Sequence, residues 1–168
     1  MPQLAEFHLP RVTSTNDYAK QLLDSYSFVL VTAQHQTQGR GRNGKTWVGD
    51  HGANIYASFG IRHGNGAGLV LSPEDIASYM ARGALSVYET LQDLLPETSF
   101  RLKYPNDVLA TTATGWSKVS GILVEHEFSG NVCASTVVGI GVNVEQEEFP
   151  DTIAQPCTSL RALGSQIS

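Results

Sequence analysis

Apolar positions along the chain change their spacing several times, and these changes predict an order of strands and helices. Two segments, 13–26 and 71–96, repeat apolar residues at helical spacing. Short β-branched or alternating runs predict strands around them. The predicted strands cover 6–12, 27–34, 52–62, 99–110, 118–128 and 135–144. A turn at 129–131 joins the last two strands, and 156–168 has the pattern of a helix that begins and stops early.

Capping residues support both helices. Ser14 or Thr13 can accept a hydrogen bond at the start of the first helix. Ser72 is placed to cap the long helix, Pro73 occupies its first position and Pro96 ends it. The helices come early and the hairpins late. This order predicts an α/β or α+β domain in which helices back a mixed β-sheet.

The composition fits one globular domain. The chain has 168 residues, 41% of them hydrophobic, and a formal charge of −5. That acidity argues against a nucleic-acid surface, and no apolar run is long enough for a membrane span. The first residues lack the pattern of a signal peptide, and Cys133 and Cys157 form neither a disulfide framework nor a metal-binding pair. These features predict a cytoplasmic protein.

A basic, glycine-rich stretch interrupts this acidic chain. The run QTQGRGRNGKTW, residues 36–47, holds Arg40 and Arg42 among three glycines. Glycine lets the backbone approach a ligand closely, and arginine donates paired hydrogen bonds to carboxylate or phosphate. Trp47 could lie over a flat ring. The same composition also suits a solvated surface loop, so the stretch alone does not decide between the two.

Three further motifs place polar groups beside apolar strands. Lys118 opens the run KVSGILVE and can hold a ligand as a point charge, although lysine also suits a strand edge. Asn106 and Asp107 follow a proline, which by itself indicates a turn. Asn143 ends the run GIGVN, where an amide can read the edge of an adenine base. None of these motifs is decisive alone.

In combination and in this order, the motifs closely resemble the catalytic domain of biotin protein ligases, the biotin–[acetyl-CoA-carboxylase] ligases. They are STN at 14–16, QTQGRGRNGKTW at 36–47, GANIYAS at 52–58, KYPND at 103–107, KVSGILVE at 118–125 and GIGVN at 139–143. The resemblance implies the mixed-sheet fold that this domain shares with class II aminoacyl-tRNA synthetases. It also implies an enzyme that makes biotinyl-5′-AMP from biotin and ATP with Mg²⁺. That enzyme then passes biotin to a lysine of a biotin carboxyl carrier protein.

The resemblance assigns roles to individual residues. Lys118, Arg40 and Arg42 are the expected catalytic cations, facing the biotin carboxylate and the α-phosphate. The expected biotin site comprises Ser14, Thr15, Gln36, Gly39, Arg40, Lys118, Gly121 and Ile122. The expected ATP and adenylate site comprises Arg40, Arg42, Trp47, Lys118 and Asn143. Asn106 and Asp107 are expected to orient Lys118 or to stand near a metal ion, and no structural metal is expected.

The resemblance also sets expectations for domains and partners. Residues 1–168 are expected to form one catalytic domain, shortened at its C-terminal end. The N-terminal DNA-binding domain and the C-terminal SH3-like domain of relatives are expected to be absent. We therefore expect no DNA binding and no membrane binding, and a homodimer remains open.

Two alternatives remain. One is a lipoate ligase or octanoyltransferase, which shares the fold. It has no urea for Ser14, Thr15 and Gln36 to bind, and an octanoyltransferase needs an activated cysteine. Cys133 lies mid-strand without an evident base nearby in the sequence, and His126 is only a distant candidate. The other alternative is a truncated domain that binds biotin without turnover.

Overall fold

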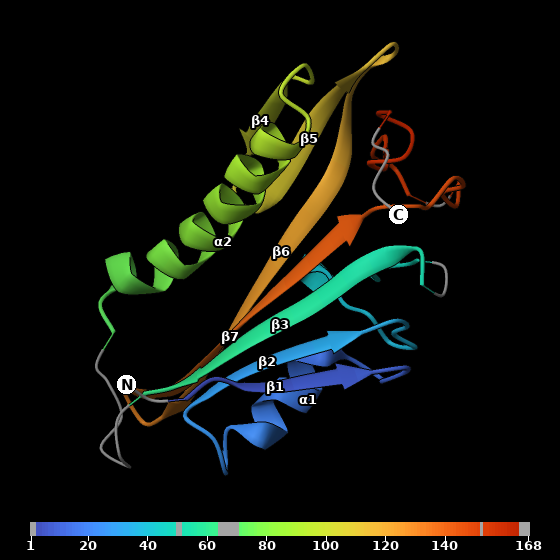
Figure 1. The fold of residues 1–168 in the computed structure, drawn as a ribbon. Coiled ribbons are helices and arrows are strands. Elements are labelled where there is room, and N and C mark those ends of the chain that lie inside the picture. Colours follow the sequence, from blue (N-terminus) through green and yellow to red (C-terminus); the bar gives the residue numbers. More distant parts are fainter. Residues whose placement is uncertain (1–2, 50–51, 64–70, 152, 165–168) are drawn as a thin grey trace.

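The computed structural model describes residues 3–49, 52–63, 71–151 and 153–164. Within them, seven strands form one sheet with a helix on each face (Figure 1). The strands are β1 (Ala5–Leu9), β2 (Phe28–Ala33), β3 (Asn54–Arg62), β4 (Phe100–Lys103), β5 (Asp107–Thr112), β6 (Gly115–Ser129) and β7 (Val132–Asn143). The helices are α1 (Thr15–Leu22), α2 (Pro73–Leu94) and a single 3₁₀ turn, η1 (Arg42–Gly44). The predicted mixed sheet backed by helices is confirmed.

The strands follow the order β1-β2-β3-β7-β6-β5-β4 across the sheet. β1 and β2 are parallel, because α1 carries the chain back between them, and the other described neighbours are antiparallel. β7 therefore lies at the centre of the sheet, where β3 and β6 flank it.

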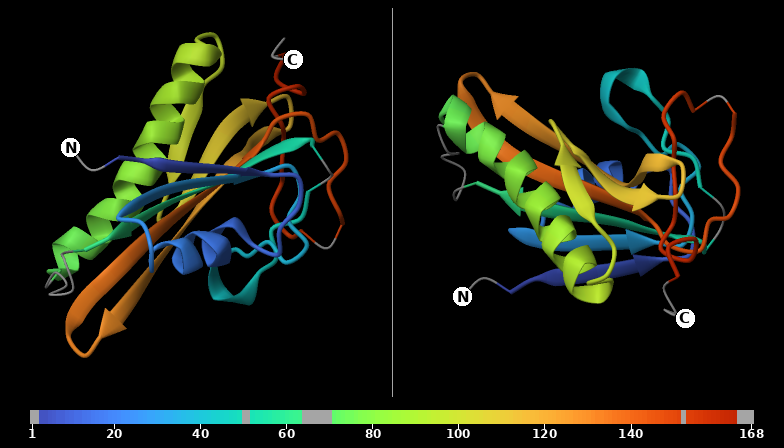
Figure 2. Two further views of the ribbon diagram at one scale, coloured as in Figure 1. Left: turned by 60° about the horizontal axis from the view of Figure 1, so that its bottom comes forward. Right: turned by 90° about the horizontal axis from the view of Figure 1, so that it is seen from above.

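Alternation along β7 separates two hydrophobic cores. Val137 packs with Val29 and Val31 beneath α1, whereas its neighbour Val138 packs with Ile122 beneath α2. Because successive side chains of a strand point to opposite faces, α1 and α2 must cover opposite faces of the sheet. The two views of Figure 2 show this arrangement.

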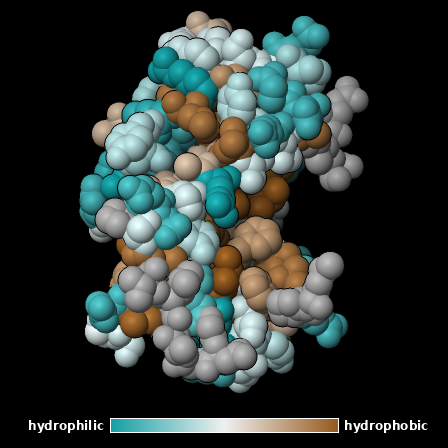
Figure 3. All heavy atoms as spheres, turned by 90° about the vertical axis from the view of Figure 1, so that its left-hand side faces the viewer, coloured by the Kyte–Doolittle hydropathy of each residue, from teal (hydrophilic) through white to brown (hydrophobic). Residues whose placement is uncertain are grey.

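The α2 face of the sheet is only partly covered. Phe59 pairs with Val138 and so shares its face, yet Phe59 is 41% exposed and Ile55, on the same strand, is 48% exposed. On the side of the molecule drawn in Figure 3, apolar side chains gather across the middle, between more hydrophilic regions. Part of the apolar surface is therefore open to solvent in the described chain.

Both predicted helix starts are confirmed. The Ser14 hydroxyl accepts a hydrogen bond from the Asp17 N–H at 3.4 Å. Ser72 and Asp75 form a reciprocal capping box, in which each side chain accepts from the other residue's N–H. α2 ends at Leu94, shortly before Pro96, as predicted, whereas α1 is shorter than the segment predicted for it.

The strand predicted over 99–110 is wrong, because the structure has two strands there. β4 ends at Lys103, the chain turns over 104–106, and β5 runs back antiparallel to β4. Pro105 lies in this turn, where it has no N–H to offer to a ladder, and its peptide bond to Tyr104 is cis. Proline also limits the first strand, since β1 ends at Leu9, just before Pro10.

The helix predicted to begin in 156–168 is also wrong over its described part. The Lys118 N–H donates to the Pro156 carbonyl at 2.7 Å, and the Thr158 N–H donates to the Lys118 carbonyl at 2.9 Å. This segment therefore runs beside β6 as an extended chain, and only turns follow over 160–164. Residues 165–168 lie outside the described chain.

Candidate functional site

The α1 face of β6 and β7 carries glycines in place of side chains. Gly121 pairs with Gly141, and Gly139 lies two residues before Gly141 on the same face. We call these three residues the glycine platform. A methyl group added at Gly121, Gly139 or Gly141 would lie 2.7, 2.3 or 2.6 Å from the nearest atom of Trp47 or Asn16. Glycine is therefore required for these neighbours to approach the sheet.

The glycine-rich loop, 39–47, folds as a small hairpin beside the platform. The Gly41 N–H donates to the Lys45 carbonyl at 2.7 Å, and the Trp47 N–H donates to the Gly39 carbonyl at 2.9 Å. Positive φ angles at 43–44 close its tip. A side chain at Gly39 would lie 2.7 Å from the Trp47 carbonyl oxygen, so the hairpin depends on glycine at this position.

Trp47 brings its indole directly onto the glycine platform. The Lys118 Nζ atom lies 5.0 Å from the centroid of that ring, within the range of a cation–π contact. The indole Nε1 atom is buried and has no hydrogen-bond partner among the described residues. A buried donor without an acceptor is uncommon in proteins, so this N–H is a polar group that the described chain leaves unsatisfied.

Lys118 is held beside the platform by an ion pair. Its Nζ atom lies 2.8 Å from Asp107 Oδ1, and the two side chains are only 21% and 13% exposed. Gln155 donates a further hydrogen bond to Asp107 at 3.3 Å. A methyl group at Gly121 would come within 2.9 Å of Lys118 Nζ, which places the ammonium group against the side-chain-free strand. The Asp107 carboxylate is therefore placed to hold the Lys118 ammonium group in one orientation.

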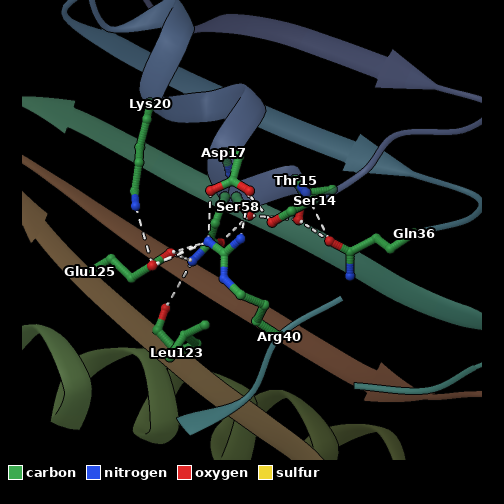
Figure 4. Close-up of polar contacts among 10 residues, drawn as sticks. Ser14, Thr15, Asp17, Lys20, Gln36, Arg40, Ser58, Leu123 and Glu125 are labelled. Atoms are coloured by element: carbon green, nitrogen blue, oxygen red, sulfur yellow. Dashed lines mark hydrogen bonds and ion pairs between the residues drawn. The ribbon is translucent and has the colours of Figure 1, made fainter. Parts of the chain in front are cut away.

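A buried polar cluster surrounds the start of α1 (Figure 4). The N–H and hydroxyl of Thr15 both donate to Gln36 Oε1, at 2.8 and 3.1 Å. The Ser58 hydroxyl lies 2.8 Å from Thr15 Oγ1 and 2.6 Å from Asn16 Oδ1. Its single proton can serve only one of them, and the amide oxygen is the group that can only accept. Ser14 is used by the helix cap, whereas Gln36 Nε2 makes no hydrogen bond to the described chain.

Arg40 points to two carboxylates, as Figure 4 shows. Its two terminal nitrogens donate to the two Asp17 oxygens at 2.5 and 2.6 Å, and Nη2 also lies 3.2 Å from Glu125 Oε1. The hydrogen bond from Arg40 holds the pKa of Asp17 below its usual value, and Asp17 in turn raises the pKa of Arg40. The guanidinium expected to face the ligand is thus already paired within the protein.

Glu125 completes this charged group. Burial alone would raise its pKa, but hydrogen bonds from Asn16 and Lys20 and the charge of Arg40 hold the pKa below its usual value. Asn16 Nδ2 donates to Glu125 at 2.7 Å, and Lys20 Nζ lies 3.2 Å from it. The carboxylate therefore stays ionised at neutral pH although it is mostly buried.

The remaining predicted residues divide between the site and the protein interior. Arg42 is exposed, and its Nη1 atom lies 3.5 Å from Asn106 Oδ1. Asn143 is buried and donates to the Thr158 carbonyl at 3.0 Å. The Ile122 side chain does not reach the site, because it follows Gly121 and so points into the core beneath α2. Only its backbone could contribute to ligand binding.

Sequence reasoning missed most of the polar network around Arg40. It assigned site roles to Ser14, Thr15 and Lys118 within STN and KVSGILVE, but gave no site role to the other polar residues in or beside these motifs and GANIYAS. The missed residues are Asn16, Asp17, Lys20, Ser58 and Glu125.

Within the part of the chain that the structure describes, no group of three or more His, Cys, Asp or Glu side chains could hold a metal ion. No helix of that part is long and apolar enough to cross a membrane.

The two cysteines differ in their distance from this site. Cys133 is fully buried near the start of β7, far along the strand from the platform, and its Sγ atom lies 4.0 Å from His126 Nδ1. Cys157 pairs through its backbone with Lys118. Burial raises the pKa of the Cys157 thiol, although the charge of Lys118 opposes this effect. The thiol form of Cys157 therefore dominates at neutral pH.

Comparison with known proteins places this geometry in one family. A model of the biotin/lipoate A/B protein ligase family matches residues 8–143. The biotin–[acetyl-CoA-carboxylase] ligase of Mycobacterium tuberculosis is 34% identical over 139 residues, which are 81% of this chain and 46% of that protein. The ligase of the same name from Paracoccus denitrificans is 37% identical over 143 residues, 81% of this chain and 53% of that protein.

Solved structures agree with the sequence comparison. The biotin protein ligase from Aquifex aeolicus in complex with biotin and ATP is 32% identical, with a TM-score of 0.69. The match covers 98% of this chain and 63% of that one. The chain thus spans about half the length of the curated relatives that it matches and less than two thirds of the solved relative.

Proposed function

The chain belongs to the biotin/lipoate A/B protein ligase family, and on this premise we propose that it is an ATP-dependent biotin–protein ligase. In the first step the biotin carboxylate attacks the α-phosphorus of ATP, pyrophosphate leaves, and biotinyl-5′-AMP forms. In the second step a lysine amine of a carrier protein attacks the acyl carbon. The amine loses a proton, AMP leaves, and an amide forms. One observation carries the proposal, namely the paired lysine, Lys118, beside the glycine platform.

The uncharged end of biotin is proposed to bind at the start of α1. Its cyclic urea has two N–H donors and one carbonyl acceptor, which need short polar side chains as partners. Thr15, Gln36 and Ser14 lie there, and Gln36 Nε2 is a donor without a partner in the described chain. The apolar ring and chain of biotin would pack near Gly39, beside the Trp47 indole that lies on the glycine platform. The Aquifex aeolicus ligase, solved in complex with biotin and ATP, supports the choice of these two ligands.

The charged end of the reaction needs cations. Carboxylate and phosphate repel each other as they approach, so groups that offset this charge lower the barrier. Lys118 and Arg42 are proposed to do so, with Asp107 holding the lysine in place. Removing one such group typically costs about 3–4 kcal/mol of barrier. Trp47 and Asn143 are proposed to contact the adenine, and such a contact would require the Asn143 amide to exchange or share its present partner.

Mg²⁺ is proposed to enter with ATP. Magnesium usually keeps several waters and is bound through substrate phosphates and one or two carboxylates. Asp107 is the carboxylate beside Lys118, and it is already paired with that lysine, while Asn106 adds one amide oxygen nearby. This donor set fits a metal ion held mainly by the phosphates of ATP, whose charge the ion would offset.

The proposed partner is the biotin-carrying domain of a carboxylase. The names of the relatives from Mycobacterium tuberculosis and Paracoccus denitrificans support this choice. The cytoplasm, predicted from the sequence, is the proposed location, and a homodimer is compatible with the proposal.

Biotin-dependent exchange of labelled pyrophosphate into ATP tests the first step without a carrier protein. The proposal predicts exchange with biotin and none with lipoate or octanoate, and transfer to an added carrier domain measures the second step. Cys157→Ser tests the acyltransferase alternative, because it should leave biotin-dependent exchange intact. An acyl group captured from octanoylated carrier protein, and lost in Cys157→Ser, would favour that alternative. Biotin binding without exchange would indicate a binding domain without turnover.

A further inference from the structure

We propose that Asp17 and Glu125 are positioning residues that hold Arg40 and thereby keep the glycine-rich loop closed over the glycine platform. We call Asp17, Arg40 and Glu125 the charged latch. The proposal deepens the proposed ligase function, on which its catalytic consequence rests. It also reassigns Arg40, which the family resemblance placed against the adenylate, to a role in fixing the loop.

The geometry of the charged latch is that of a strong, directional contact. Arg40 uses two nitrogens on the two oxygens of Asp17, at 2.5 and 2.6 Å, which is the fork arrangement that fixes both side chains. A second carboxylate, Glu125, approaches Nη2 at 3.2 and 3.3 Å. Arg40 belongs to the loop, Asp17 to the first turn of α1 and Glu125 to β6. The charged latch therefore ties the loop to two elements of the rigid domain.

The charges of this group balance. Lys20 also contacts Glu125, at 3.2 Å, so two carboxylates face two cations. Arg40 is 39% exposed and could reach a ligand only by giving up these partners. Its charge is already compensated, so it adds little attraction for an incoming anion. The arrangement suits a residue that holds the loop better than one that binds phosphate.

The charged latch is continuous with the polar cluster where the urea of biotin is proposed to bind. A chain of polar contacts connects the two, and each contact is 3.3 Å or shorter (Figure 4). Its members, in order, are Gln36, Thr15, Ser58, Asn16, Glu125 and Arg40. A ligand that orders Thr15 and Gln36 would also restrain Asn16 and Glu125. Closure of the loop is therefore expected to strengthen when the biotin site is filled.

Trypsin measures the charged latch directly, because the loop contains Arg42 and Lys45 as exposed cleavage sites. Asp17→Asn and Glu125→Gln in the ligand-free chain should each be cut at these sites faster than the wild type, by on the order of fivefold. Asp24→Asn is the matched control, since Asp24 is exposed just after α1 and its side chain has no hydrogen bond or ion pair to the loop among the described residues. Wild-type cutting rates in Asp17→Asn and Glu125→Gln, with unchanged thermal midpoints, would overturn the proposal.

Kinetics test the consequence for the reaction. A loosened loop should release biotinyl-AMP on the order of fivefold faster and raise KM for ATP, with a smaller effect on kcat. Asp17→Glu, which keeps the carboxylate, should restore part of the retention. Asp17→Asn combined with Arg40→Gln should be no worse than Arg40→Gln alone, because both remove the same contact. Additive losses in the double variant would overturn the proposal.

Tryptic cutting and pyrophosphate exchange test the charged latch and the ligase function separately. Tryptic cutting needs no ligand, so it reports on the charged latch even if the wild type forms no adenylate. Absence of biotin-dependent exchange in the wild type would count against the ligase proposal alone. Normal exchange and retention in Asp17→Asn, together with faster cutting, would contradict the positioning role and leave only a structural contact.

Discussion

Lys118→Ala can separate the charge that Lys118 is proposed to contribute to catalysis from its pairing with Asp107. The substitution leaves the Asp107 carboxylate, only 13% exposed, without its ion-pair partner. Breaking a buried pair costs about 3–5 kcal/mol and breaking an exposed one costs less than about 1 kcal/mol. This pair lies between those limits, and Gln155 still donates to Asp107. We therefore expect Lys118→Ala to lower the free energy of unfolding by about 2 kcal/mol.

The double variant Lys118→Ala/Asp107→Asn removes both charges and should recover most of that stability. It should not recover the reaction rate. Loss of a cation that acts mainly in the transition state is expected to lower kcat for adenylate formation by about 10²- to 10³-fold. Biotin affinity should fall far less, because the urea end of biotin is proposed to bind elsewhere, at the start of α1.

Three measurements decide this prediction. Chemical denaturation gives stability, calorimetry gives biotin affinity and pyrophosphate exchange gives the adenylation rate. Lys103→Ala is the matched control, since Lys103 is an exposed lysine of β4 that contacts Gln155. Recovery of the rate together with the stability in the double variant would show that Lys118 is structural. Equal losses in biotin affinity and adenylation would contradict its role in the transition state.

Three further substitutions test the platform, two histidines with lowered pKa values and a helix cap. Gly141→Ala would place a methyl group 2.6 Å from Trp47, so the free energy of unfolding should fall by about 1–3 kcal/mol in chemical denaturation, and no loss would show that the indole moves away freely. Burial lowers the pKa of His63 and of His126 below 6.5, so the unfolded chain binds protons first as the pH falls. The free energy of unfolding should therefore decrease below about pH 6.5, and it should decrease less in His126→Gln. An equal pH dependence in the variant and the wild type would refute the contribution of His126. Ser72→Ala should cost about 1 kcal/mol in denaturant unfolding, and no change would contradict the capping box.

The two helices were predictable because their signals are local. Ser14 and Ser72 each cap a helix through residues only three positions away. The split of 99–110 into two strands was also within reach, since Pro105 can neither donate to a ladder nor sit in a central strand. The extended path of 156–158 was not, because it depends on hydrogen bonds to Lys118, which is distant in the sequence.

The residues of the candidate site also include some that local sequence patterns could have predicted and others that they could not. Alternation along β6 could have excluded the Ile122 side chain, since it must point away from the face of Gly121. By contrast, nothing local connects Arg40 with Asp17, 23 residues earlier, or with Glu125, 85 residues later. Motif resemblance proposed Arg40 as a functional residue but could not identify its partners, and the partners determine what its charge can do.

The two arginines of the loop end in opposite electrostatic settings although one residue separates them. Arg40 contacts two carboxylates, whereas within the described residues Arg42 and Lys45 have no carboxylate partner. On the proposed roles, an arriving anion meets the charge of Arg42, which no carboxylate offsets in the described residues, and that of Lys118, which Asp107 holds in place, while Arg40 keeps the hairpin closed. Two arginines can therefore meet two requirements that a single arginine could not meet at the same time. A cation that binds the ligand has to release it after reaction, and a cation that fixes the loop has to stay paired throughout the cycle.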